Sequence, residues 1–405
     1  MTAHIYDVVI VGAGPGGTAV GYALARRGLD VLLLDKASFP RDKTCGDALT
    51  PRAVAVLASM GVLTQARAAG FAIHRLDVVV PNGNTLQVSL RSTGIEPDNA
   101  LVVPRLVLDD ILLRHAIRAG AQFRAAFHVE NIEARKDRVV VLGNQERNYV
   151  ELEARLVVAA VGASTRLLHN TGLLDDVPPL ILAVRAYFEG VRDVDDSIRF
   201  HFDQVPLPGY GWLFATGPNF ANIGAGVIAS NGRWKRKRKA HVALAALQRS
   251  PVVAAMLLEA RQVGPVKGFP IHTDFATAKT FGKRVLLVGE AAGLVNPLTG
   301  EGIDYALESG LTAAQRAAEM ISADDYSERK YTHYDRLLRE KYQRLFEFSN
   351  RIRILSLNPI ALNSLQRWAH RRTDLTALLI RISLGDQPIP AKITPGRILR
   401  VLSGA

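Results

Sequence analysis

Glycines gather directly after an apolar segment near the N-terminus, in a pattern that can bind a phosphate-containing ligand. Gly12, Gly14 and Gly17, with Pro15 among them, follow the strand-like residues 6–11 and precede an alanine-rich, helix-like stretch. In such a turn one glycine permits a tight bend, a second lets the backbone approach a pyrophosphate, and a third allows close helix–strand packing. The helix directs its unpaired N–H groups at the anion. The pattern predicts a dinucleotide site, and a packing turn without a ligand is the structural alternative.

An acidic residue lies where a dinucleotide needs one. Residues 31–34 form a second apolar segment that ends at Asp35, 18 residues after Gly17, and Lys36 follows. A carboxylate at this strand end can accept a hydrogen bond from an adenosine ribose hydroxyl. The strand, turn, helix, strand and acid together predict the adenosine half of NAD or FAD, and they do not distinguish the two cofactors.

A second glycine motif favours FAD. The apolar residues 285–288 lead into Gly289 and Glu290, and the segment 294–303 leads into a predicted helix. A helix N-terminus stabilises the negative charge that a reduced flavin carries near N1 and C2. A nicotinamide enzyme does not need this distant second site, whereas an extended FAD does. The residues expected to contact FAD here are Gly289, Glu290, Leu298, Thr299, Gly300, Gly302 and Ile303.

Three aromatic residues alternate along one predicted strand. Tyr210, Trp212 and Phe214 are each two positions apart, so their side chains face the same side of that strand. They would wall an apolar site for a hydrophobic small molecule. The alternative is that they are ordinary core residues of an antiparallel sheet.

The order of the segments predicts an α/β fold with two units and a helical tail. Strand-like and helix-like segments alternate, and a strand-rich stretch with Pro and Gly interrupts them near residues 180–230. We expect a Rossmann-like FAD-binding domain interrupted by a substrate domain built on a mostly antiparallel β-sheet. The expected boundaries are 1–75, 100–175 and 275–325 for the FAD-binding domain, 76–99 and 176–274 for the substrate domain, and 326–405 for a basic helical C-terminal region.

The composition is that of a globular protein with an uneven charge. Of 405 residues, 48% are hydrophobic and 22% are charged, and the formal net charge is +12. Basic residues concentrate in the runs 233–239 and 326–405, which favours contact with anionic lipid or a diphosphate. No nucleic-acid motif accompanies this charge, so nucleic acid is not expected as a partner. A solvated basic surface is the alternative. The single cysteine excludes a disulfide framework and a cysteine-built metal cluster.

Two further features concern membranes. No apolar run is long enough for a spanning helix, and the N-terminus lacks the pattern of a signal peptide, which predicts a cytoplasmic protein. Residues 341–357 mix Arg with Leu, Phe and Ile. Such a mixture is typical of an interfacial helix on an anionic membrane, and equally of a tail helix packed on the core. Peripheral contact with an anionic membrane is therefore a further expectation.

Several of these motifs resemble those of known flavoproteins. The N-terminal glycine motif, Gly289-Glu290 and the run NPLTGEGI at 296–303 are similar to proteins related to p-hydroxybenzoate hydroxylase. The run RDKTCGD at 41–47 resembles a segment of the geranylgeranyl reductase family. The run PGYGWLF at 208–214 resembles that family's aromatic signature. Within the family, the cysteine segment is most similar to bacterial reductases of the menaquinone prenyl chain.

The resemblance implies an FAD enzyme that reduces C=C bonds of a polyisoprenoid chain, geranylgeranyl or menaquinone prenyl. It implies that NAD(P)H or a redox protein donates the electrons. It places Cys45 and Gly46 beside the flavin, with Cys45 donating or relaying a proton or only shaping the site, and Tyr210 is expected at the same reaction centre together with Trp212. Arg105 matches the family's arginine at a helix start beside the cofactor.

Departures from the family pattern keep a second reaction class open. Ala215 replaces the proline of the aromatic signature, Val161-Gly162 replaces an Asp-Gly pair, and Glu290 replaces an aspartate. The missing aspartate weakens the case for direct use of a pyridine nucleotide. The alternative function is an FAD-dependent aromatic monooxygenase, which inserts oxygen, or a related halogenase.

Overall fold

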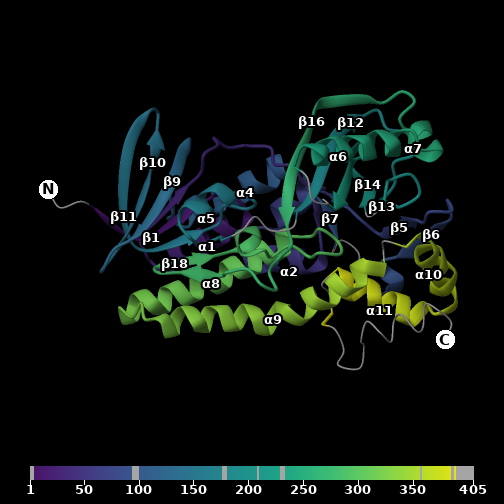
Figure 1. Cartoon of the computed structure of the whole chain (residues 1–405). Coiled ribbons are helices and arrows are strands. Elements are labelled where there is room, and N and C mark those ends of the chain that lie inside the picture. Colours follow the sequence, from purple (N-terminus) through teal and green to yellow (C-terminus); the bar gives the residue numbers. More distant parts are fainter. Residues whose placement is uncertain are drawn as a thin grey trace.

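The computed structural model describes residues 4–93, 100–175, 180–207, 209–228, 233–355, 358–384 and 387–388, apart from some side chains within them. Two large sheets lie at opposite ends of the molecule, and long helices run along one side of it (Figure 1). The side chains of the basic run at 233–238 and the basic end of the chain at 389–405 lie outside the described residues.

The first sheet is a parallel sheet with an antiparallel addition, in the order β17-β18-β11-β1-β2-β8. The central strand β1 pairs in parallel with both β2 and β11, and its residues from Val8 to Val11 are buried. Burial on both faces explains why these strands are continuous apolar runs without alternation. The strands are β1 (Ile5–Val11), β2 (Val31–Leu34), β8 (Gln122–Arg124), β9 (Phe127–Ala134), β10 (Val139–Gln145), β11 (Asn148–Ala159), β17 (Phe281–Gly282) and β18 (Val285–Leu287).

Helices cover this sheet and carry its connections. Helix α1 (Pro15–Ala25) packs against α8 (Ile303–Ala323) and α4 (Arg105–Arg118). Parallel strands of one sheet end at the same edge, so the segments after β1, β2, β11 and β18 converge there. The two glycine motifs, which are far apart in the sequence, follow β1 and β18 at this edge. The predicted α/β fold is confirmed.

The second sheet is antiparallel except for one parallel pair, β13 with β5, and has the order β16-β12-β15-β14-β13-β5-β6. One face is covered by α6 (Arg233–Gln248) and α7 (Pro251–Met256). The other face carries Trp212 and Phe214. The strands are β5 (Arg75–Val79), β6 (Thr85–Ser89), β12 (Leu180–Glu189), β13 (Ser197–His201), β14 (Gly209–Gly217), β15 (Phe220–Ile228) and β16 (Arg261–His272).

Short elements fill the space between the sheets. Strands β3, β7 and β4 form a small third sheet, and helix α2 follows β3 directly. These and the other short elements are β3 (Ala48–Leu49), α2 (Pro51–Ser59), α3 (Leu63–Ala68), β4 (Phe71–Ala72), η1 (Arg91–Thr93), β7 (Leu101–Val102), α5 (Thr165–Asn170) and η2 (Gly289–Ala292).

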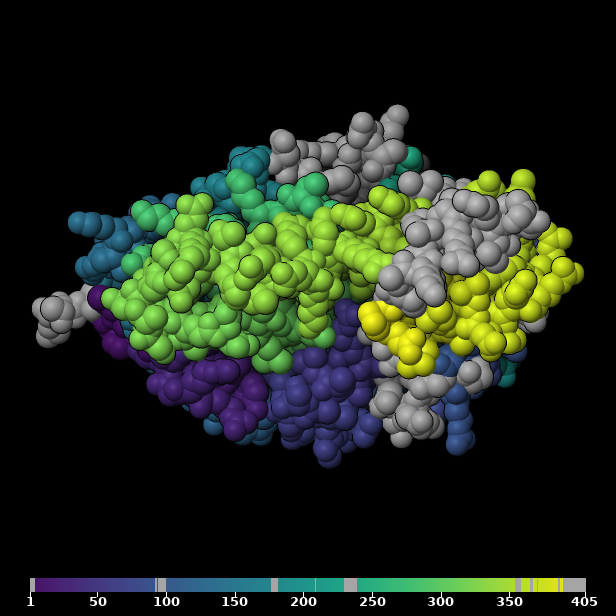
Figure 2. All heavy atoms as spheres, turned by 90° about the horizontal axis from the view of Figure 1, so that it is seen from below, coloured from purple at the N-terminus to yellow at the C-terminus, as the bar shows by residue number. Residues whose placement is uncertain are grey.

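Three helices make up the described C-terminal region: α9 (Glu328–Leu355), α10 (Pro359–Arg371) and α11 (Thr373–Ser383). Figure 2 shows the green helices along one face of the molecule, leading to the yellow C-terminal helices at one end. In α9, Tyr342, Leu345, Phe346 and Phe348 are buried in the core. The burial of these four side chains agrees with a tail helix packed on the core, and peripheral contact with an anionic membrane stays a prediction. Among the described helices, none has the length and apolar character to cross a bilayer.

Candidate functional site

The N-terminal glycine turn is tightly packed on one side. The Gly12 N–H donates to the Leu34 carbonyl at 2.7 Å. A Cβ on Gly12, whose φ is +105°, would lie 2.3 Å from the Ala160 oxygen, and a Cβ on Gly17 would lie 1.8 Å from the Gly12 oxygen. These two glycines are required because strands β1, β2 and β11 and helix α1 approach one another here with no room for a side chain.

The other side of the same turn is open and cationic. A Cβ on Gly14 would have only the guanidinium nitrogens of Arg41, at 3.5 Å, and Arg105, at 4.0 Å, as its nearest neighbours. A cleft of about 390 Å³ lies over this turn. The predicted site residues that line it are Gly12, Gly14, Pro15, Asp35, Lys36, Arg105, Gly289 and Glu290. The structure thus brings both glycine motifs to one cleft, with Gly17 packed beneath it.

Asp35 has a structural contact that sequence reasoning did not anticipate. Its Oδ2 accepts a hydrogen bond from the Ala13 N–H at 2.9 Å, and its Oδ1 accepts one from the Ala37 N–H at 2.9 Å. The carboxylate therefore orients the glycine turn while it lines the cleft. The predicted contact with a ribose hydroxyl stays a prediction. Lys36 is exposed at the cleft edge.

Two arginines share one buried carboxylate at the centre of the cleft. Arg105 donates to both Asp109 oxygens at 2.7 Å, and Arg41 forms an ion pair with Asp109 at 2.9 Å. Arg41 also lies 3.9 Å from the Asp35 carboxylate, and both guanidinium groups present nitrogens toward Gly14. Arginine in such a site suits a pyrophosphate, because its donors match phosphate oxygens in pairs. The glycine motif predicted the anion site, and Arg105 came from the family resemblance.

The loop at 41–47 is fixed by a buried carboxylate at its end. Asp47 has a left-handed backbone, with φ of 69°. Its Oδ2 accepts from the Tyr187 hydroxyl at 2.5 Å and the Asn222 amide at 2.8 Å, and its Oδ1 accepts from the Arg105 N–H at 3.2 Å. Burial raises the pKa of Asp47 to about 6, and these hydrogen bonds oppose the shift. Asp47 thereby joins the loop to α4 and to the second sheet.

Cys45 lines an inner cavity of about 150 Å³ together with Tyr210, Trp212 and Phe214. Burial raises the pKa of the Cys45 thiol to about 11, so the thiol is protonated at neutral pH. Gly46 allows the loop to approach the aromatic residues, because a Cβ there would lie 2.8 Å from the Phe214 ring. Thr299, Gly300, Gly302 and Ile303 complete this cavity from the side of α8.

The aromatic residues of β14 form a continuous strip along the inner cavity. The ring centroids of Tyr210 and Trp212 are 6.1 Å apart, and those of Trp212 and Phe214 are 6.3 Å apart. The Tyr210 hydroxyl donates to the Thr299 carbonyl at 2.7 Å, and the Trp212 indole N–H donates to the Asn222 side chain at 3.0 Å. The three rings face one side of the strand, as the alternation predicts, and each polar atom has a partner.

The acid of the second glycine motif is also buried. Glu290 accepts a hydrogen bond from the His272 N–H at 3.1 Å. Burial raises the pKa of Glu290, and the positive charge of Lys43 opposes the shift. The ammonium group of Lys43 lies 3.1 Å from the centroid of the Phe269 ring, and burial lowers its pKa to about 8. Lys43 and Glu290 therefore form a partly compensated charge pair between the cleft and the inner cavity.

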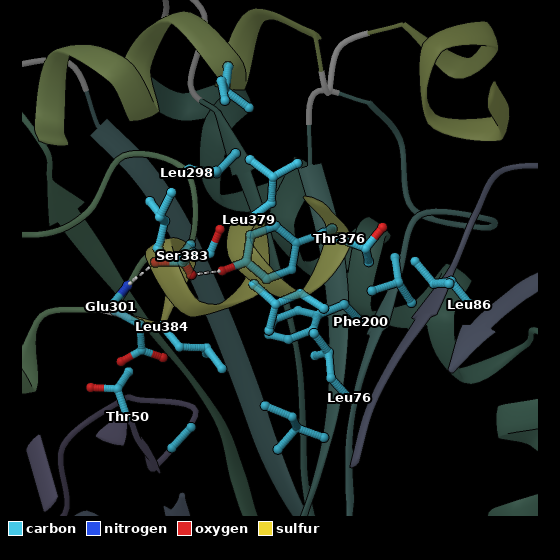
Figure 3. A pocket seen from close by; sticks show the side chains of 18 of the residues that line it. Thr50, Leu76, Leu86, Phe200, Leu298, Glu301, Thr376, Leu379, Ser383 and Leu384 are labelled. Carbon is cyan, nitrogen blue, oxygen red and sulfur yellow. Dashed lines mark hydrogen bonds between the residues drawn. The ribbon is translucent and has the colours of Figure 1, made fainter. Parts of the chain in front are cut away.

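A larger apolar cavity, of about 290 Å³, opens from the inner one (Figure 3). The two cavities share Ala48, Phe200, Tyr210, Thr299 and Glu301. Strands β5 and β6 supply Leu76 and Leu86, and Leu298 lies here rather than in the inner cavity. The opposite wall comes from α9, α10 and α11. Sequence reasoning missed this role of the C-terminal helices, because no local pattern shows which distant sheet they cover.

The arrangement forms a path of changing polarity. A cleft at the parallel sheet, lined by Arg41 and Arg105, adjoins a small aromatic cavity, which adjoins a larger apolar cavity. A dinucleotide in the cleft would place its reactive end at the aromatic cavity, where a hydrophobic molecule can meet it away from water. Such a site suits redox chemistry on an apolar molecule.

Comparisons with known proteins agree with this geometry. The chain matches the FAD binding domain family over residues 5–342. It is 34% identical to menaquinone reductase of Mycolicibacterium smegmatis, with 93% of this chain and 90% of that protein covered. It is 33% identical to digeranylgeranylglycerophospholipid reductase 1 of Methanopyrus kandleri, with 86% and 89% covered.

Solved structures share the fold. A geranylgeranyl bacteriochlorophyll reductase-like protein of Thermoplasma acidophilum superposes with a TM-score of 0.75 at 23% identity, over 99% of this chain and 96% of that one. A triple mutant of a flavin-dependent brominase superposes with a TM-score of 0.73 at 19% identity, over 98% and 99%. The fold alone therefore does not separate reduction from halogenation.

Two alanine substitutions in the glycine turn should have different effects. Gly14 has an extended backbone, with φ −76° and ψ −173°, so Gly14→Ala should fold normally while its methyl group enters the cleft. Overpacking costs about 1–3 kcal/mol, so FAD should bind about tenfold more weakly. Gly12→Ala instead forces a clash at 2.3 Å and should lower the thermal midpoint of the FAD-free protein. Fluorescence titration measures FAD affinity, and thermal unfolding measures the midpoint. Unchanged FAD affinity in Gly14→Ala would show that the pyrophosphate does not bind at Gly14.

Proposed function

The chain belongs to the FAD binding domain family, and from this premise we propose that it is an FAD-dependent oxidoreductase that reduces C=C bonds of a polyisoprenoid chain. Relatives named menaquinone reductase and digeranylgeranylglycerophospholipid reductase, at about one-third identity over most of both chains, support this reaction. The substrate is a geranylgeranyl or menaquinone prenyl chain.

The observation that carries the proposal is the apolar cavity that opens into the aromatic one. Apart from a few hydroxyl groups and Glu301, the side chains around it are aliphatic or aromatic. A polyisoprenoid chain can be buried in such a cavity over several units, with about 0.8 kcal/mol gained for each buried CH₂ group. A compact aromatic substrate of a hydroxylase does not require a cavity of this kind.

FAD fits the cleft in one orientation. The pyrophosphate would lie on the Gly14 turn near Arg41 and Arg105, where the positive charge and the open side of the turn support it. The adenosine would lie toward Asp35 and Lys36. The flavin ring would extend to the inner cavity, between the loop with Cys45 and Gly46 and the segment from Thr299 to Ile303.

Reduction of an isolated alkene needs close alignment, because no carbonyl group polarises the bond. The flavin, when reduced, supplies the hydride. The chain's own residues exclude water and hold the alkene beside it: Tyr210 and Trp212 form one wall, and the neutral Cys45 thiol forms another. Alignment of this kind contributes a large part of the rate of such reactions.

The electrons come from outside the protein. We assign the donor to NAD(P)H or a reduced redox protein, because each turnover removes two electrons from the flavin. Val161-Gly162, in place of the Asp-Gly pair of relatives, lines the FAD cleft, and this departure favours the redox protein.

The C-terminal helices also support a peripheral membrane contact. Helices α10 and α11 line the apolar cavity on one side and expose Arg367, Arg371 and Arg372 on the other. Ile360, at the start of α10, is 74% exposed. A helix that exposes both cations and an apolar residue is typical of surfaces that meet anionic headgroups.

Mass spectrometry of the isoprenoid lipids of cells with and without this protein tests the reaction. We expect a lipid whose mass rises by two hydrogens for each reduced bond, and the lipid that changes is the substrate. A gain of one oxygen in a metabolite instead would support the monooxygenase and contradict the reductase.

A tryptophan at Leu86 should shorten the apolar cavity. Leu86 is buried in the cavity wall on β6, and Figure 3 places it across the cavity from Glu301. Leu86→Trp should lower kcat/KM about tenfold for a long prenyl chain and much less for a short one, because only the long chain reaches this wall. Val242→Trp, at an exposed site on α6, is the control. Equal losses of kcat/KM for both chain lengths would show that Leu86 does not line the substrate path.

Binding to lipid vesicles tests the membrane contact. The protein should sediment with vesicles that contain phosphatidylglycerol, and added salt should weaken this binding. The double variant Arg371→Glu/Arg372→Glu should bind less than the control Arg135→Glu/Lys136→Glu, whose exposed residues lie on the β9–β10 hairpin. Equal binding to neutral phosphatidylcholine vesicles would show that the basic surface is only solvated.

A further inference from the structure

One carboxyl group lies in the otherwise uncharged substrate cavity. Among the described residues that line the apolar cavity, Glu301 is the one acidic side chain, and it also lines the inner cavity with Cys45. It therefore stands where the path of the substrate meets the predicted position of the flavin ring. Figure 3 shows its carboxyl group beside Thr50 and Leu384, at the edge of the cavity.

The backbone holds Glu301 in this position. The Glu301 carbonyl accepts a hydrogen bond from the Asn296 N–H at 2.8 Å, and the Glu301 N–H donates to the Thr299 hydroxyl at 3.3 Å. Gly300, with φ of +75°, makes the bend that precedes it, and the Tyr210 hydroxyl would lie 2.9 Å from a Cβ at Gly300. The residue is thus at a fixed turn rather than on a free loop.

The carboxyl group itself has no protein partner. Within the described part of the chain, no hydrogen bond or ion pair to the Glu301 carboxyl is formed, although its backbone is bonded on both sides. A charged carboxylate without a partner in an apolar cavity is unfavourable, so the neutral acid is the stable form. A neutral carboxylic acid is a proton donor that faces the substrate.

We propose that Glu301 is the general acid that protonates the alkene, an inference that rests on the proposed prenyl reduction. The C=C π bond breaks, and two C–H bonds form in its place. One carbon takes a hydride from the reduced flavin, which is oxidised. The other carbon takes the Glu301 proton, and the carboxylate left behind takes up a proton from water for the next turnover.

The electrostatic surroundings match this role. Burial and the negative charge of Asp304 raise the pKa of Glu301 to about 8. The other titratable groups that face it are Cys45 on the loop, Tyr210 on β14 and Tyr305 on α8. The Cys45 thiol, with a pKa of about 11, is a weaker acid. The Tyr210 hydroxyl already donates to the Thr299 carbonyl, and burial raises its pKa further above its usual value.

Single-turnover kinetics test the proposal. FAD-loaded protein is reduced with dithionite without oxygen and mixed with a geranylgeranyl lipid, and flavin reoxidation is followed by absorbance. Because the acid form is the active one, the wild-type rate should be level below pH 8 and fall above it. Glu301→Gln, which keeps the shape but not the proton, should be slower by about 10²–10⁴-fold and should lack this fall. Glu340→Gln, at an exposed site on α9, should behave as wild type.

Infrared titration of the oxidised FAD-bound protein gives a readout without turnover. The wild type should show a protonated-carboxyl band that titrates near pH 8, and Glu301→Gln should lack that component. Glu301→Asp, a second variant in case Glu301→Gln fails to retain FAD, should keep a pH-dependent rate at a lower level. Cys45→Ala should also keep the pH dependence.

Three different results would contradict either the role of Glu301 or the proposed function on which it rests. A wild-type rate and pH profile in Glu301→Gln would overturn the role of Glu301. Loss of the pH dependence in Cys45→Ala, with Glu301→Gln unaffected, would assign the proton to the thiol. If the lipid did not reoxidise the reduced wild-type flavin, the proposed function itself would fail.

Discussion

The buried Asp47 carboxylate connects the parts of the site. It accepts hydrogen bonds from β12 through Tyr187, from β15 through Asn222 and from the first N–H of α4 at Arg105. Asn222 also bonds the Trp212 indole and the Cys45 carbonyl. One carboxylate and one amide therefore hold the aromatic strip, the thiol loop and the cationic helix in a single arrangement. Loss of the carboxylate would leave several buried donors unpaired, and each such group costs about 1–3 kcal/mol.

The three cavities differ in how far the charged side chains around them are paired with opposite charges. In the cleft, the carboxylates of Asp109 and Asp35 hold Arg41 and Arg105, whose remaining donors face Gly14. Between the cleft and the inner cavity, the charges of Lys43 and Glu290 partly compensate one another. Among the described residues around the apolar cavity, none is a counter-charge to Glu301, and its pKa of about 8 keeps it mostly neutral at neutral pH. Burial thus raises the pKa of both Glu290 and Glu301, and only at Glu290 does a neighbouring cation oppose the shift.

Local patterns predicted the parts of the site that lie within one stretch of chain. The glycine turn, Asp35, the alternation of Tyr210 with Trp212 and the start of α8 could be predicted, because each is a short-range constraint on backbone or side-chain direction. The bridging role of Asp47 could not be predicted, because its hydrogen-bond partners lie 140 and 175 positions away in the sequence. Composition alone left residues 341–357 undecided, and in the structure Phe346 packs against Phe275 and Tyr305, as expected of a tail helix on the core.

The walls of the substrate cavity come from segments that are far apart in the sequence. Its first wall, on β5 and β6, precedes its final described wall, at residues 376–384 of α11 and the turn after it, by about 300 residues. The lining of the cofactor cleft ends at Ala306. During synthesis a dinucleotide site can therefore be complete while the apolar face of the second sheet still lacks its cover. For that part of its synthesis, the chain exposes an apolar surface that a chaperone or an early-bound ligand can cover.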